Sequence, residues 1–131
     1  MKVLIGDYPE DGSERQIEVE IHNQDIWNLD FTLANIILPA LIKFRSNLNS
    51  YPGEFAEVQE DGVDGSVGGG IKKWEEILDH MIWSFTCVVT DDDYYHYYEN
   101  HGKSWVGYTE HLAKVDEGLM LFGKYFRNLW D

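Results

Sequence analysis

The fold is decided by the stretch IKKWEEILDHMIWSFTCV, which runs from Ile71 to Val88. Its large apolar residues recur at spacings of three and four, which is typical of the buried stripe of an amphipathic helix. The acidic residues Glu75, Glu76 and Asp79 lie off that stripe. We therefore predict a helix over residues 71–88 that contributes to the core through Ile71, Trp74, Leu78, Met81, Phe85 and Val88.

Two longer apolar repeats of the same period lie on either side of this stretch. The first begins at Asn28 and continues for roughly twenty residues. The second begins at Thr109 and continues to Leu129. It contains Gly118 and Gly123, which lower helix propensity, so we expect both to pack closely against another backbone.

A shorter helix is predicted between these segments. Asp91–Asp93 precede the run Tyr94–Tyr98, and carboxylates at such a position favour a helix N-terminus. Gly102 would end this helix.

The N-terminal residues have the pattern of strands. Lys2–Ile5 and Gln16–Ile21 flank a turn-rich stretch, and the second segment alternates polar and apolar residues. This period of two predicts a β-hairpin with Ile17, Val19 and Ile21 facing inward. The fold class is therefore mainly α (α+β), with three to four helices around one core and an N-terminal β-hairpin.

The chain is short enough to form one domain over residues 1–131. We expect the hairpin in 1–22, the helical part in 28–131 and an acidic, glycine-rich loop at 49–70. The glycines of this loop lack the strand and the Gly-Lys-Ser/Thr signature of a phosphate-binding loop. Lys72 and Lys73 follow them at a helix start, which leaves a weaker anion site open.

The charge of the chain restricts its partners. Asp and Glu number 24 against 10 Lys and Arg, and the resulting net charge of −14 disfavours direct binding to nucleic acid or to anionic membranes. Aromatic residues make up 15%, which distinguishes the chain from a disordered acidic tail. Cys87 is the single cysteine and forms no intramolecular disulfide, and no apolar run approaches a signal peptide or a membrane span, so we expect a cytoplasmic protein.

Two groups of residues are candidates for a metal site. Glu75, Glu76, Asp79 and His80 are spaced by one helical turn and offer oxygen ligands to Mg²⁺, although a second acidic helix opposite, such as Asp116-Glu117 or Asp30, is also needed. A solvated helix face is the plainer interpretation. The five histidines and Cys87 show no zinc-binding spacing, and Cys87 is interpreted as a small buried apolar residue. We expect no metal, no cofactor and no catalytic residue.

A ligand site is predicted where cations and aromatic rings gather on the first, second and last long helices. Such a combination can stack a base and pair with a phosphate, although helix-end cations and core aromatics give the same pattern. The candidate residues are Lys43, Arg45, Trp74, Trp83, Lys124, Tyr125, Arg127 and Trp130.

Three blocks of sequence, Trp27–Pro39, Trp74–Phe85 and Gly118–Asp131, together resemble a widespread family of small proteins encoded by tailed bacteriophages. The resemblance implies a phage accessory protein that acts in the cytoplasm of the host bacterium. Similar proteins tend to have His in place of Phe31 and Glu in place of His80, which weakens a metal site shared between Asp30 and Asp79.

Three functions follow from these observations. The leading hypothesis is a non-enzymatic counter-defence protein that binds and sequesters a small nucleotide signal of host immunity. The first alternative is an acidic inhibitor that mimics nucleic acid and blocks a host defence nuclease. The second is a magnesium-dependent nucleotide hydrolase that uses Glu75, Glu76 and Asp79.

We also expect a homo-oligomer. A two-stranded hairpin is marginally stable alone, and a small domain cannot bury every aromatic side chain. The residues expected at the contact are Tyr94, Tyr95, Tyr97, Tyr98 and Trp105.

Overall fold

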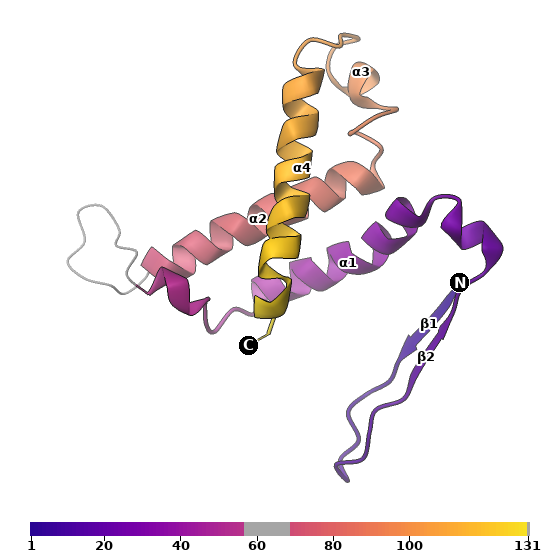
Figure 1. Ribbon diagram of the computed structural model, residues 1–131, viewed down its shortest axis with the longest axis vertical. Coiled ribbons are helices and arrows are strands. Elements are labelled where there is room, and N and C mark those ends of the chain that lie inside the picture. The colour runs from indigo at the N-terminus through magenta and orange to yellow at the C-terminus, as the bar shows by residue number, and fades with distance from the viewer. Residues whose placement is uncertain (57–68, 131) are drawn as a thin grey trace. The chain divides into compact units, whose positions relative to one another are not determined.

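The computed structural model describes residues 1–56 and 69–130 and has the predicted mainly α fold with a small N-terminal β-hairpin (Figure 1). The acidic loop predicted at 49–70 lies mostly outside the described residues. The contacts divide the chain into two compact units, Met1–Thr32 and Leu33–Asp131. The expectation of one domain stays a prediction.

The first unit is built on an antiparallel hairpin of β1 (Lys2–Ile5) and β2 (Ile17–Glu20). In its register, Val3 pairs with Val19 and Ile5 with Ile17. Because side chains alternate across a strand, these four residues share one face, while the opposite face is mostly charged. The hairpin is therefore amphipathic.

The inward orientation predicted for Ile17, Val19 and Ile21 is wrong. These side chains are 62%, 55% and 51% exposed, and no residue of 1–32 is buried. The sheet has only two strands, so the first unit contains no second layer that could cover the apolar face.

The start of β1 is tied to the short 3-10 helix η1 (Asn23–Ile26). The amino group of Met1 lies 2.8 Å from the carboxylate of Asp25. The backbone N–H of His22 donates to the same carboxylate. These hydrogen bonds lower the pKa of the Asp25 carboxyl, and the one from the amino group has the larger effect.

The core of the second unit is formed around α2 (Gly69–Val89). The buried stripe predicted on this helix is confirmed for Trp74, Leu78, Met81, Phe85 and Val88. Against it pack α1 (Leu29–Ser46), through the part that belongs to this unit, and the 3-10 helix η2 (Gly53–Phe55). The first turn of α2 lies so close to η2 that a Cβ at Gly70 would be 2.8 Å from the carbonyl oxygen of Phe55.

After α2 the chain turns sharply at Asp91–Asp93 before the short helix that was predicted to follow them. Asp91 has a φ of 56°, which an α-helix does not accommodate, and turns extend to α3 (Tyr97–Asn100). The carboxylates build a turn, so the short helix predicted after them starts later, at Tyr97, and it ends before Gly102 as expected. The long C-terminal helix α4 (Tyr108–Tyr125) follows, and the 3-10 helix η3 (Phe126–Asn128) continues from it.

Helices α2 and α4 cross in close contact (Figure 1). At the contact, a Cβ added to Gly118 would collide with the hydroxyl oxygen of Ser84 and would lie 2.8 Å from the carbonyl oxygen of His80. The predicted close approach is thus confirmed for Gly118. It is wrong for Gly123, which is exposed and would place a Cβ in open space.

We predict that Gly118→Ala destabilises the protein and Gly123→Ala does not. The first substitution forces the two helices apart, at a cost of about 1–3 kcal/mol typical of overpacking. The second should stabilise the protein by up to about 1 kcal/mol because alanine favours the helix. Urea unfolding of both variants measures the difference. Equal effects of the two substitutions would contradict the assigned helix contact.

Candidate functional site

A pocket of about 380 Å³ lies between α2 and α4. Its size falls within the range of small-molecule sites. Helical spacing places the lining residues on one face of each helix. They are Lys73, Glu76, Ile77 and His80 from α2, and Glu117, Leu121, Lys124 and Tyr125 from α4.

The pocket combines cations, carboxylates and apolar walls. Lys73 and Lys124 supply ammonium groups, and the latter lies 5.2 Å from the ring centre of Tyr125. Glu76 and Glu117 place carboxylates in the same pocket, one from each helix. A ligand that carries both an anionic group and hydrogen-bond donors fits this mixture.

His80 is held in place within this pocket. Its Nε2 lies 2.8 Å from the carbonyl oxygen of Lys114. Because a carbonyl oxygen only accepts hydrogen bonds, Nε2 is the protonated nitrogen. In the neutral ring, Nδ1 is then a hydrogen-bond acceptor.

The predicted magnesium ligands do not gather at one point. Arg45 lies with its Nε 3.0 Å from Asp79 and its Nη2 3.5 Å from Glu75, so it compensates both carboxylates. Glu76 instead lines the pocket with His80. Among the described residues, these three acidic side chains do not converge to the spacing of a metal site.

The predicted ligand residues are dispersed. Trp74 is 1% exposed and packs against Phe44, Phe55 and Tyr125 in the core. Of this set, Lys124 and the buried Tyr125 line the pocket between α2 and α4.

The other members of the set lie elsewhere. Lys43 and Arg127 are exposed, and Trp83 is half-buried with the ammonium group of Lys114 4.9 Å from its ring centre. Trp130 is 73% exposed and borders a second pocket, of about 390 Å³, together with Trp74. The predicted ligand role of the whole set stays a prediction.

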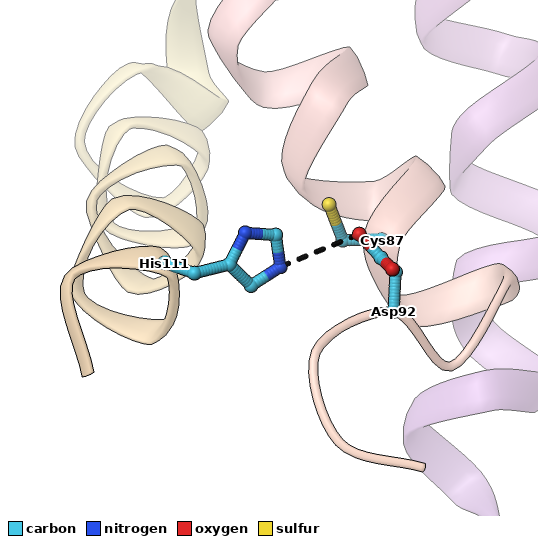
Figure 2. A group of neighbouring side chains, drawn as sticks. All are labelled: Cys87, Asp92 and His111. Carbon is cyan, nitrogen blue, oxygen red and sulfur yellow. Dashed lines mark ion pairs between the residues drawn. The ribbon is translucent and has the colours of Figure 1, made fainter. Parts of the chain in front are cut away.

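A second group of chemically active side chains lies near the other end of α2. Cys87, Asp92 and His111 point toward one another from α2, from the turn after it and from α4 (Figure 2). These are the residue types of a nucleophilic cysteine site. However, Cys87 is buried, and the pKa of its thiol is raised to about 11. The largest cause is burial, followed by the negative charges of Asp92 and Asp93, while the positive charge of Lys114 acts in the opposite direction. The neutral thiol is a weak nucleophile.

Sequence reasoning missed both groupings in part. The sequence indicates Lys73 as part of an anion site and Glu117 as part of a second acidic helix face. No sequence pattern places either of them near Lys124. Asp92 and His111 gave no recognisable motif with Cys87, because successive members are five and nineteen positions apart. The pairing of α2 with α4 brings both groups together.

The comparisons with known proteins add nothing to this geometry. No family model matches the chain, and neither a curated protein nor a solved structure matches it significantly. Across the residues that the structure describes, every helix is too short or too polar to cross a lipid bilayer.

We predict that the tryptophans of the second pocket differ in their effect on stability. Trp74→Ala should cost about 3–5 kcal/mol, because it removes a fully buried ring from the core. Trp130→Ala should change the unfolding free energy by less than about 0.5 kcal/mol, since most of its ring is already in solvent. Urea titrations followed by circular dichroism measure both. A large loss for Trp130→Ala would contradict its exposed position.

Proposed function

We propose that the protein is a phage accessory protein that binds a small nucleotide signal of host immunity and sequesters it without catalysis. The observation that carries the proposal is the pocket between α2 and α4, in which Lys73 and Lys124 line a hollow that is open to solvent on a strongly acidic chain. The resemblance of three sequence blocks to tailed-phage proteins supports the cellular setting.

The lining of the pocket suits the parts of a nucleotide. Lys73 and Lys124 can pair with a phosphate. Ile77 and Leu121 provide apolar surface against which a base can lie, and the carboxylates of Glu76 and Glu117 can accept hydrogen bonds from its amino group.

The carboxylates also restrict the charge of the ligand. Glu76 and Glu117 repel a highly charged triphosphate unless a cation accompanies it. A phosphodiester carries a single charge per phosphate and meets less repulsion. The proposed ligand class is therefore a phosphodiester nucleotide, cyclic or linear.

A second candidate, a magnesium-dependent nucleotide hydrolase, is favoured by one observation. Glu76 and His80 line the pocket from α2 and Glu117 lines it from α4, so both helices contribute a carboxylate, although within the described residues these side chains do not lie at metal-ligand spacing. The metal ligands of such a hydrolase would differ from the predicted set, because Glu75 and Asp79 already form ion pairs with Arg45.

We predict that Lys124→Ala weakens nucleotide binding at least about tenfold, the loss expected for one hydrogen bond to a charged group. Isothermal titration against cyclic mononucleotides, cyclic dinucleotides and nucleoside triphosphates measures it. Lys43→Ala is the matched control, because Lys43 is exposed and does not line the pocket.

Three outcomes decide the proposal. Mass spectrometry of the released ligand should return the nucleotide unchanged in the presence of Mg²⁺, whereas a cleaved product would favour the hydrolase. Absence of binding across the panel would refute both. Equal weakening by Lys43→Ala and Lys124→Ala would locate the ligand outside this pocket.

Assembly into a homo-oligomer belongs to the same proposal. Val3, Ile5, Ile17 and Val19 give the hairpin one exposed apolar face, and each of them is at least 41% exposed. A second copy of the chain has a matching apolar face, so two hairpins can pack face to face as layers of a symmetric sandwich.

The tyrosine-rich segment offers less to such a contact than expected. Tyr94, Tyr95 and Trp105 are exposed. Tyr97 is buried and donates a hydrogen bond from its hydroxyl to the carbonyl oxygen of Val106, 2.7 Å away. The expected role of Tyr97 in a contact between two copies of the chain therefore stays a prediction, and its ring is not exposed.

We predict that light scattering gives a mass of at least twice the 15.3 kDa of one chain. Val19→Lys should lower the mass toward a single chain, because it places a charge on the apolar face. Glu18→Lys alters the opposite face and should leave the assembly intact. A single-chain mass for the unaltered protein would contradict the proposed oligomer.

A further inference from the structure

Three side chains of the types that bind transition metals converge at the end of α2. The thiol sulfur of Cys87, a carboxylate oxygen of Asp92 and an imidazole nitrogen of His111 all lie within 4.8 Å of one another (Figure 2). They come from three separate segments, so the convergence is a product of the tertiary fold. The pocket proposed for nucleotides has no residue in common with this group.

The turn after α2 holds Asp92 in a defined position. Asp91 adopts a left-handed conformation, and the backbone N–H of Asp92 donates to the carbonyl oxygen of Cys87 at 2.9 Å. The side-chain amide of Asn100 donates to Oδ1 of Asp92 at 2.8 Å. The other oxygen, Oδ2, is left facing His111.

The imidazole of His111 has an unsatisfied nitrogen at this point. Its side chain is 11% exposed, and Nε2 is buried without a hydrogen-bond partner in the part of the chain that the structure describes. Oδ2 of Asp92 lies 3.5 Å from it, beyond a good hydrogen bond. A buried polar atom left in this way is costly, and a ligand that takes its lone pair removes the cost.

We propose that Cys87, Asp92 and His111 bind a divalent cation of the zinc class. Tetrahedral bonds of the lengths typical of zinc separate neighbouring ligand atoms by about 3.3–3.6 Å. The 3.5 Å between His111 and Asp92 already meets this spacing. No separation in the group exceeds 4.8 Å, so the closure required is at most about 1.5 Å, within the reach of side-chain adjustment.

The ligand types select the metal. A thiolate and an imidazole favour Zn²⁺ or Co²⁺ over Mg²⁺ and Ca²⁺, which take oxygen ligands. Three protein ligands leave a fourth position for water. Asn100 orients the carboxylate from outside the coordination sphere, as such groups commonly do in zinc sites.

The charges around the group are compatible with a cation. Asp92 and Asp93 place negative charge near the Cys87 sulfur, and Lys114 places an opposing positive charge nearby. The side chain of His101 also faces Asp92, with Nδ1 at 3.8 Å from Oδ1. A bound dication stabilises the thiolate that these carboxylates otherwise disfavour.

Titration of the reduced full-length protein with Co²⁺ tests the site. Because Cys87 is the only cysteine, a thiolate-to-cobalt charge-transfer band in the near ultraviolet reports on this residue alone. We expect the band to appear, to vanish on addition of Zn²⁺, and to be absent in Cys87→Ser. Absence of the band in the unaltered protein would overturn the proposal.

Two further variants keep the test independent of the cysteine. His111→Gln and Asp92→Asn should each weaken Co²⁺ binding at least about tenfold, since even groups outside the coordination sphere cost that much in zinc sites. His96→Gln is the matched control, because this histidine is exposed and lies outside the group. Circular dichroism verifies that each variant is folded. Unchanged affinity in both ligand variants, or equal weakening in His96→Gln, would overturn the proposal.

Discussion

The close contact between α2 and α4 at Gly118 sets the relative positions of the two groups of functional side chains that these helices share. At this point a side chain larger than hydrogen would collide with Ser84 and with the backbone of His80. The glycine therefore sets the distance and the register between the helices. On one side of the contact, the first half of α2 faces the last turns of α4, and on the other side Cys87 faces His111.

The same contact shows why the elements could be predicted from sequence and their pairing could not. The apolar stripe of residues 71–88 and the alternation in the hairpin are local patterns, and each specifies its own element. The register between two helices depends on complementary surfaces of both. Gly118 gave a usable signal because a helix has little other reason to hold glycine there. Gly123 gave the same signal and has no packing role, so composition alone does not distinguish the two.

The candidate ligand set illustrates a second limit of sequence reasoning. Aromatic side chains serve the core and a binding site equally well, and burial decides between these uses. Trp74 and Tyr125 form one ring cluster with Phe55, so their main contribution in this structure is to packing. The sequence predicts that Arg45 binds a ligand phosphate, but in the structure its guanidinium group pairs with Asp79 and Glu75. A surface charge of one sign often has its first partner within the same chain.

The convergent residues of the second unit were also hidden by their separation in sequence. Cys87, Asp92 and His111 show no fixed spacing because a turn and a helix start, rather than one regular element, supply two of them. Motifs with regular spacing are visible when one helix or loop provides several ligands. A left-handed residue such as Asp91 makes a site of another kind, in which the turn aims one carboxylate at a distant helix.

The two sites on the α2–α4 pair are linked by the packing that they share. A cation at the proposed site of Cys87 and His111 would bridge the end of α2 to the start of α4, and a ligand in the proposed nucleotide pocket would bridge Lys73 to Lys124 at the opposite ends. Each ligand that binds only the packed form stabilises that form in proportion to its concentration and affinity. If opening of the helix pair contributes to ligand release, binding at one site strengthens binding at the other by the same factor in both directions. The tight contact at Gly118 limits this coupling, because a pair that is already closely packed has little opening left to suppress.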